Sequence, residues 1–318
     1  MKKLFINILK ITLIVFPLCF IISRIQLSEF TIAIHKVSLW TIPLFLLVTL
    51  CVIAMQGFRW WLLIVPFAPD VTLLKTMSSH FAAQFYSIVL PTSAAQDFIR
   101  ASLLSGCSDK SVPWAATFIT RLNGLLVLFL FSLTGIVLVG KSVFPPDVIL
   151  ISVVLFIVFL ILVFFSFSKK ITRPVRLLLE KKIPHKIMFI LTEIRQAIYN
   201  YRKHRKILAV NFLVTVLTQF LSIITAIILI YGVTGKIYFV ETLAFIPIIE
   251  IITISLPLTP GGIGVRDILV AGYFSFLQLS MEQAGVYIIL SYLGVAMKLT
   301  GIIPIVMGKT QKRVKPLK

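Results

Sequence analysis

Six stretches of about twenty predominantly apolar residues restrict this chain to one class of fold. A helix needs roughly twenty apolar residues to cross the ~30 Å hydrocarbon core of a bilayer. The runs are continuous and lack the strict alternation of an outer-membrane barrel. With 59% hydrophobic and 13% charged residues, the chain also differs from soluble domains, in which about a quarter of residues are charged. We predict an all-α polytopic integral membrane protein with full spans at 4–22, 38–56, 114–139, 147–167, 207–231 and 284–307.

The basic residues are gathered into short segments beside these spans. Of 31 Lys and Arg residues, twelve lie between residues 169 and 206, five in the tail 309–318 and three before residue 11. Such segments mark the cytoplasmic side of a membrane and attract anionic lipid headgroups. No aromatic-basic recognition motif accompanies the net charge of +20, so no nucleic-acid partner is expected.

Two further segments, residues 72–104 and 239–278, are long enough to cross and return, but similar motifs interrupt them. The first contains LPTSAAQDFIR, which ends at Arg100, and the second contains LPLTPGGIGVR, which ends at Arg266. In each motif the arginine follows a Leu-Pro pair and small residues, nine positions after the proline. Irregular backbone at membrane depth requires protein or water to satisfy its polar groups. We therefore predict two re-entrant or broken-helix hairpins.

The distribution of charge predicts that the hairpins enter from opposite faces of the membrane. With the N-terminal lysines inside, two spans return the chain to the cytoplasm at Arg59, and the first hairpin begins and ends there. Three full spans then precede the second hairpin. Both termini are cytoplasmic in this topology of a cell-membrane protein, and the external loops contain Arg24, Lys36, Lys141 and Lys236. The result is an inverted repeat, a fold in which the transport site forms where two broken helices meet. Chance similarity between two proline-bearing segments is the alternative.

The whole chain, residues 1–318, is expected to form a single transmembrane domain. Half one covers 1–167 and half two 207–308, with a basic connector at 169–206 and a basic tail at 309–318. Apolar residues recur at helical spacing in the connector, at Ile187, Ile190, Leu191, Ile194, Ile198 and Tyr201. This pattern predicts an amphipathic helix in the inner headgroup layer.

The first motif has the sequence of a capped helix start. Ser93 and Gln96 match a capping box, so a helix should begin at Ser93. Asp97 then falls in the first turn, where a carboxylate favours the positive helix end. Arg100 should lie one turn further along on the same face.

The second motif predicts a loop with little side-chain bulk. Gly261, Gly262 and Gly264 leave backbone N–H groups free to approach a ligand, and the next helix should begin near Val265. Arg266 then lies in a first turn, where a cation opposes the helix dipole and needs an anionic partner.

Asp267 is adjacent to Arg266 but should point to another face. The partner of Arg266 is therefore expected to be Asp97, Glu250 or a ligand phosphate, whose oxygens match the guanidinium fork. Together these features describe a cradle for an anionic headgroup. The alternative is a salt-bridge network that locks the hairpins, with glycines serving helix packing.

Two other polar groups occupy apolar segments. Glu250 has no charged residue within eight positions, and proton coupling, contact with a substrate amine and a helix–helix hydrogen bond are its alternatives. His80, with Gln84, Tyr86 and Ser87, gives the helix leading into the first hairpin a polar face that would line a headgroup path. A packed, hydrogen-bonded histidine is the alternative. We expect no metal site and no cofactor, because the three cysteines and four histidines lack ligand spacing and no P-loop is present.

Four pieces of the chain carry a resemblance to a known family: GFRWWLLI at 57–64, FAAQFYSIVLP to FIRASLL at 81–104, TRLNGLL at 120–126 and LPLTPGGIGVRD at 256–267. The chain resembles the flippase-like family that includes the transmembrane domain of lysylphosphatidylglycerol synthases, also called multiple peptide resistance factors. It departs from the family pattern at Ala94 and Ala95, where glycines are common, and at Asp267, where a glutamate is common. The resemblance implies a stand-alone member that translocates lipid without a synthetase domain.

The sequence thus predicts a protein that moves an anionic or phosphate-bearing lipid between leaflets by alternating access. The lipid would be a phospholipid, an aminoacyl-phospholipid or a polyprenyl-phosphate-linked lipid, held by the arginines of the two motifs. No catalysis is expected. The alternatives are an integral transferase that uses Asp97 or Asp267 as a base on lipid-linked substrates, and a non-transporting partner of an envelope enzyme. A homo-oligomer is compatible with each of these functions.

Overall fold

The computed structural model describes residue 23 and residues 25–89, 93–140, 146–167, 185–255 and 263–308. Within these residues every regular element is a helix, as predicted. The elements are α2 (Leu27–His35), α3 (Thr41–Ile64), α4 (Leu73–Val89), α5 (Ser93–Leu103), α6 (Val112–Val139), α7 (Pro146–Phe167), α9 (His185–Tyr201), α10 (Arg205–Thr234), α11 (Phe239–Ser255), α12 (Val265–Phe276), α13 (Met281–Ala296), the 3-10 segment η2 (Met297–Gly301) and α14 (Ile302–Val306).

Four of the described helices are long and apolar enough to cross a membrane. They are α3, α6, α10 and the continuous stretch Met281–Val306 formed by α13, η2 and α14. These helices confirm the predicted spans at 38–56, 114–139, 207–231 and 284–307. The span predicted at 147–167 is helix α7, whose stretch Ser152–Ile161 is apolar. The span predicted at 4–22 and the tail 309–318 lie outside the described residues.

Helix α3 corrects one boundary of the prediction. The apolar window ended at residue 56, and Arg59 was assigned to a cytoplasmic loop, but the helix continues to Ile64. It continues because its polar residues have interior neighbours: Gln56 accepts a hydrogen bond from Gln84 of α4, and Arg59 is surrounded by other helices. A polar residue therefore does not end a span when another helix covers it.

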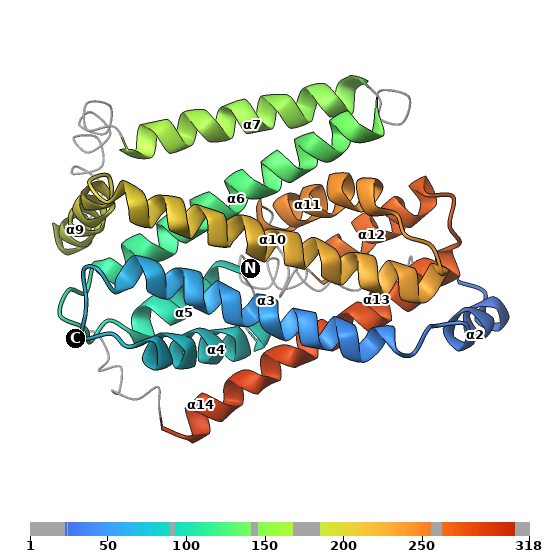
Figure 1. The fold of residues 1–318 in the computed structure, drawn as a ribbon, viewed down its shortest axis with the longest axis horizontal. Coiled ribbons are helices and arrows are strands. Elements are labelled where there is room, and N and C mark those ends of the chain that lie inside the picture. Colours follow the sequence, from blue (N-terminus) through green and yellow to red (C-terminus); the bar gives the residue numbers. More distant parts are fainter. Residues whose placement is uncertain are drawn as a thin grey trace, which may run out of the picture.

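The long helices pack side by side along the long axis of the molecule (Figure 1). Helix α10 packs on α3, and α11 packs on α6. A glycine permits the second contact, because a Cβ added at Gly135 would lie 2.4 Å from the backbone nitrogen of Ala244. Close backbone approach at small residues is the usual means by which membrane helices associate.

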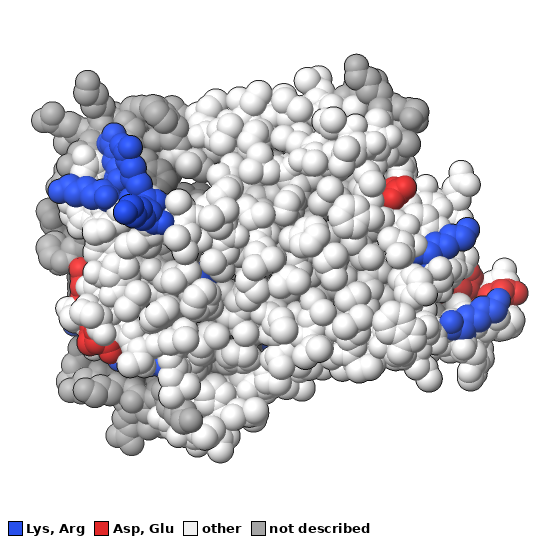
Figure 2. All heavy atoms as spheres, in the orientation of Figure 1, with Lys and Arg blue, Asp and Glu red and all other residues white. Residues whose placement is uncertain are grey.

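Charged side chains lie at the two ends of the bundle. On the face shown in Figure 2 the blue and red residues gather at both ends of the long axis, and the broad zone between them is mostly uncharged. Large apolar side chains such as Leu213, Leu217 and Val137 are exposed there. Such a belt suits contact with lipid rather than water.

The two ends have separate cores. One end, here called the α9 end, joins the end of α3, the start of α6 and the last turns of α9 around Trp60 and Ile119. The opposite end, here called the α2 end, joins α10, α11, α12 and the start of α13 around Phe274 and Tyr287.

The two helix hairpins insert from opposite ends. Helices α4 and α5 have their open side at the α9 end, where Val71 and Leu104 are both in the core. Helices α11 and α12 have theirs at the α2 end, where Tyr238 and Leu277 pack on the core. Figure 1 shows the two pairs in opposite halves of the long axis. This opposed arrangement is the geometry expected of the inverted repeat, and insertion of the hairpins into a bilayer stays a prediction.

Helix α9 forms within the predicted connector, and its described apolar residues show what part of its surface contacts; the surroundings of Ile187, Ile190 and Leu191 lie outside the description. The helix lies across the α9 end of the bundle (Figure 1). Ile194, Ile198 and Tyr201 pack on α3 and α6, and the buried Tyr201 hydroxyl donates a hydrogen bond to the Leu63 carbonyl. At least this part of the apolar face is therefore covered by protein rather than by lipid.

Candidate functional site

The first motif forms a cluster of charged side chains, here called the first centre. Helix α5 begins at Ser93, as predicted, but Asp97 lies beyond its first turn, which corrects that expectation. An Asp97 carboxylate oxygen forms an ion pair with Arg100 Nη2 at 2.9 Å. The second carboxylate oxygen of Asp97 accepts from Arg121 of α6, which the sequence analysis did not assign to the site. Arg100 is only 4% exposed. One carboxylate therefore holds two guanidinium groups from different helices.

A third arginine and a tryptophan complete the first centre. The guanidinium carbon of Arg100 lies 5.0 Å from the centroid of the Trp60 ring, a distance at which cation–π attraction acts. Arg59, one residue earlier on α3, lies within electrostatic range of Arg100 and Asp97. A Cβ added at Gly124 would lie 3.8 Å from both terminal nitrogens of Arg59, so the Arg59 side chain reaches α6.

The polar face predicted on α4 is mostly present and buried. His80 is 0% exposed, and Gln84 and Ser87 are also buried at the helical spacing that places them on one face. Tyr86 is 40% exposed and lies outside this face, which corrects its inclusion. Within the residues that the structure describes, neither ring nitrogen of His80 meets the geometry of a hydrogen bond, although the backbone of Ile53 is near.

The second motif forms a compact group of its own, here called the second centre. Helix α12 begins at Val265, as predicted, and Asp267 is 0% exposed. The Asp267 carboxylate accepts from the Gly264 N–H at 3.0 Å and from the Tyr292 hydroxyl. A carboxylate that accepts several hydrogen bonds can be buried without a large desolvation penalty.

The expectation that Asp267 points away from Arg266 was wrong. The Nη2 of Arg266 lies 3.3 Å from Asp267, the adjacent residue, and donates to Ser291 of α13 at 2.6 Å. The guanidinium also lies over the Tyr292 ring, 5.4 Å from its centroid. The Asp267 side chain turns back to cap the helix start, and the long Arg266 side chain can follow it there. The spacing of residues along a helix does not show how far the Arg266 side chain can extend toward the helix start.

Glycines of the second motif have different roles from those predicted. Gly264 has φ of 87°, a conformation that favours glycine, and its N–H is used by Asp267 rather than left free. Gly261 and Gly262 lie outside the described residues. In the described structure the loop therefore binds its own carboxylate.

The remaining predicted residues lie nearby. Glu250 of α11 accepts from Ser222 of α10 at 3.2 Å and lies within electrostatic range of Arg266. Gln96 is in the first turn of α5 and is partly exposed. Lys298 of η2 is within electrostatic range of both Arg266 and His80.

Arg59, Arg121 and Lys298 were missed, although a signal for each was present. Arg121 and Lys298 interrupt predicted spans, and a charge inside a membrane helix is a functional hypothesis by default. Arg59 was missed because the second span was ended too early. Among the described residues, no group of His, Cys, Asp and Glu is placed to hold a metal ion.

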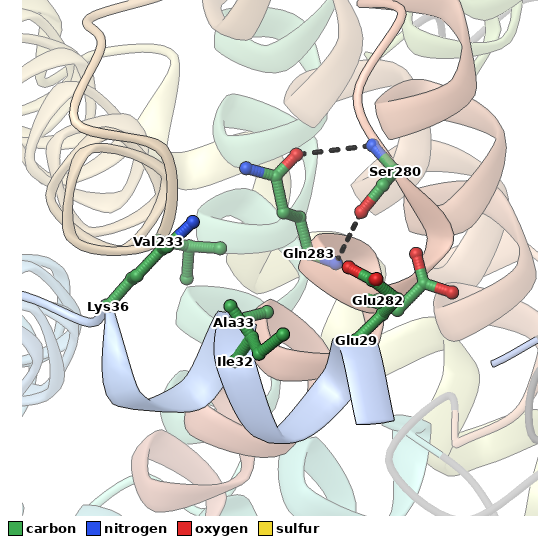
Figure 3. Close-up of a pocket in the computed structure, with 8 residues that line it drawn as sticks. All are labelled: Glu29, Ile32, Ala33, Lys36, Val233, Ser280, Glu282 and Gln283. Carbon is green, nitrogen blue, oxygen red and sulfur yellow. Dashed lines mark hydrogen bonds between the residues drawn. The ribbon is translucent and has the colours of Figure 1, made fainter. Parts of the chain in front are cut away.

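A separate shallow pocket of about 130 Å³ lies at the α2 end, between α2 and the start of α13. Figure 3 shows Ser280 and Gln283 of its wall joined by two hydrogen bonds, with Glu282 beside them and Lys36 on the opposite side, near Val233. These bonds cap α13. None of the side chains of the two centres lines this pocket.

The sequence of the chain, compared with known proteins, agrees with this geometry. The family model described as "Lysylphosphatidylglycerol synthase TM region" matches residues 7–293, nearly the whole chain. The chain belongs to this family. It is therefore a membrane domain of a kind associated with lipid handling, and the resemblance stated above is confirmed. No curated protein and no solved structure gives a significant match.

The lysylphosphatidylglycerol synthase TM region includes both centres. Arg59, Asp97, Arg100, Arg121 and Asp267 all fall inside the match. Lys298 and α14 follow it, so the 3-10 segment beside α4 is a feature of this chain outside the matched region.

Proposed function

We propose that this protein moves an anionic or phosphate-bearing lipid between membrane leaflets by alternating access. The observation that carries the proposal is the pair of opposed hairpins, each of which has an Arg–Asp pair on its second helix inside the bundle. Opposed broken helices around a central site are the usual architecture of alternating-access transporters. Family membership supports lipid as the cargo.

Each residue has a distinct role in this proposal. Arg100 and Arg266 hold the headgroup, since guanidinium forks bind phosphate oxygens in pairs. Asp97 and Asp267 hold the arginines when no lipid is present and release them to it. Lys298 offers a further cation within electrostatic range of Arg266 and His80. The hydrocarbon tails stay in the bilayer beside the apolar belt.

The substrate class follows from charge and from surroundings. A phospholipid, an aminoacyl-phospholipid and a polyprenyl-phosphate-linked lipid share a phosphate group that the arginines can bind. Glu250 lies near Arg266 and supplies a negative group to contact a substrate amine or carry a proton. The protein would act at the cell membrane with both termini in the cytoplasm.

A transferase reaction is less well supported. Asp97 accepts from two arginines, and Asp267 accepts from Gly264, Tyr292 and Arg266, so neither carboxylate is a free base. A general base must reach the proton that it removes and remain available to accept it. Product formed from a lipid-linked substrate by purified protein, and lost in Asp97→Asn, would replace the transport proposal with an enzymatic one.

Transport can be tested in liposomes that contain the purified protein and a trace of fluorescent phosphatidylglycerol, phosphatidylcholine or polyprenyl phosphate. A membrane-impermeant quencher reports how fast the label changes leaflets. We expect faster exchange of a phosphate-bearing anionic label than of phosphatidylcholine. Arg100→Gln and Arg266→Gln should each slow it at least about tenfold, because each removes charge-assisted hydrogen bonds to the phosphate.

Arg202→Gln is the matched control. Arg202 is exposed in the turn between α9 and α10, so this variant makes the same charge change away from both centres. It should keep the wild-type rate. A label that never changes leaflets faster than in protein-free liposomes, for all three lipids, would refute transport.

A further inference from the structure

The first centre contains more buried donors than its own acceptors can satisfy. Within the described part of the chain, Arg59 Nε, Arg59 Nη1, Arg100 Nε and Trp60 Nε1 are all buried and have no hydrogen-bond partner. A buried donor without a partner costs about 1–3 kcal/mol, and a charged one costs more. Four such atoms lie on three neighbouring side chains. If unpartnered donors arose by chance, we would expect them to be scattered through the protein.

Charge in the first centre is also unbalanced. Arg59, Arg100 and Arg121 are three cations, and Asp97 is the one carboxylate that the described residues place among them. The second centre differs, because Arg266 contacts Asp267 and has Glu250 in range. An excess of positive charge inside a membrane domain is unfavourable unless an anion compensates it.

The donors lie on side chains of α3 and α5 that are near one another. Arg59 is within electrostatic range of Arg100, and the Arg100 guanidinium carbon lies 5.0 Å from the centroid of the Trp60 ring. Like charges are brought together in this way when an anion binds between them. The centre can be reached from outside, because the side chains of Asp97 and Arg121 remain 22% and 32% exposed.

We propose that Arg59, Arg100 and Trp60 form a binding site for a phosphate group, with Arg59 as its principal ligand. The site deepens the proposed function, since lipid transport would make the phosphate that of a lipid headgroup. Its existence rests on the unpartnered donors and the excess charge alone.

The proposed site predicts the direction in which replacement of Arg59 changes the stability of the protein when no phosphate or lipid is bound. An arginine that has no carboxylate of its own and no bound anion is an uncompensated charge, so its removal should not destabilise the fold. Arg59→Gln should unfold at the same temperature as wild type or higher when phosphate and lipid are absent. A structural role for Arg59 predicts the opposite sign.

Binding is measured by titration calorimetry on full-length protein in detergent, after removal of co-purified lipid. One arm uses inorganic phosphate against chloride at equal ionic strength. The other uses mixed micelles of phosphatidylglycerol against phosphatidylcholine. Arg59→Gln should weaken binding about tenfold or more, Arg59→Lys should weaken it less, and Arg202→Gln should leave it unchanged.

Each outcome decides the proposal. Binding of phosphate in both arms assigns the site to any phosphate group, and binding only in the lipid arm assigns it to a headgroup. Equal affinity in Arg59→Gln and Arg202→Gln overturns it, as does a lower unfolding temperature for lipid-free Arg59→Gln. Phosphate bound through Arg59 by a protein that moves no lipid in liposomes would leave the site intact and remove the transport function. Wild-type lipid exchange in Arg59→Gln would leave the transport function intact and remove Arg59 as a ligand of the lipid headgroup.

Discussion

Asp97 and Arg121 are 24 residues apart in the chain, yet they share an ion pair that ties the first hairpin to α6. The same carboxylate also holds Arg100, so the hairpin and a spanning helix meet at one charged group. A movement of the hairpin that broke this contact would release two arginines together.

Replacing Asp97 by Asn should destabilise the protein strongly. Arg59, Arg100 and Arg121 would then lie together without a carboxylate, and removing one partner of a buried ion pair costs roughly 3–5 kcal/mol. The partial exposure of Asp97 favours the lower end, about 3 kcal/mol. Thermal unfolding in detergent checks this prediction. Arg121→Gln, which leaves Asp97 paired with Arg100, should lose only about 1 kcal/mol, and the exposed Glu29→Gln should change stability by less than about 0.5 kcal/mol.

Asp267→Asn should loosen the second hairpin. The carboxylate accepts from Gly264, Tyr292 and Arg266, and an amide would turn an N–H group toward at least one of these donors. We expect a loss of about 3 kcal/mol or more in unfolding free energy. Tyr292→Phe removes one of these hydrogen bonds and should lose about 1.5–3 kcal/mol. Equal stability of wild type and Asp267→Asn would show that this network does not hold the hairpin.

The contact between α6 and α11 depends on the absence of a side chain at Gly135. A Cβ at Gly135 would lie 2.4 Å from the Ala244 backbone nitrogen, so Gly135→Ala should force the helices apart at a cost of about 1–3 kcal/mol. Gly272 of α12 is the matched control, since a Cβ there meets nothing within 4 Å. Gly272→Ala should be neutral or stabilise by up to about 1 kcal/mol, because alanine loses less backbone entropy in a helix. Comparing the two unfolding temperatures tests the contact directly.

Acid should weaken the loop contact at the α9 end. Hydrogen bonds from the Ser108 hydroxyl and N–H hold the pKa of Asp70 below its ordinary value. Because the folded-state pKa is lowered, the stabilisation is present above the unfolded pKa of about 3.9 and is lost as pH falls through the folded value. Asp70→Asn should therefore be less stable than wild type at neutral pH. Unfolding temperatures of the two proteins that still differed at pH 2 as they do at pH 7 would contradict this assignment, and Ser108→Ala should reproduce the neutral-pH effect.

Much of the candidate site was predictable from single residues in apolar surroundings. Arg100 and Asp97 were predicted to share a face of one helix, and their ion pair confirms this. The helix starts at Ser93 and Val265 followed from proline, glycine and capping patterns. These are local properties, which depend on neighbours within one turn.

Prediction failed where a contact depended on another helix. Arg59 was assigned to a loop because the hydropathy of a sequence window contains no information about the helices α6 and α10 that surround it. Arg266 was given a distant partner because spacing along a helix does not include the bending of a long side chain back to the helix start. Tyr86 was grouped with His80, although it is exposed and the buried polar residues 80, 84 and 87 share one face of α4.

The sequence alone determined that this chain spans a membrane through helices and that two polar motifs interrupt it. From the distribution of charge it also predicted that the two motifs lie on opposite sides of the membrane. These conclusions rest on the length of apolar runs, on turn residues and on charge distribution. Each of these depends on neighbouring residues in the chain or on interactions with the bilayer, and not on contacts between distant helices. Only the tertiary structure decided which charges meet. Arg59, Arg100 and Arg121 come from three helices that are far apart in the chain, and their excess over Asp97 arises only when packing brings those helices together.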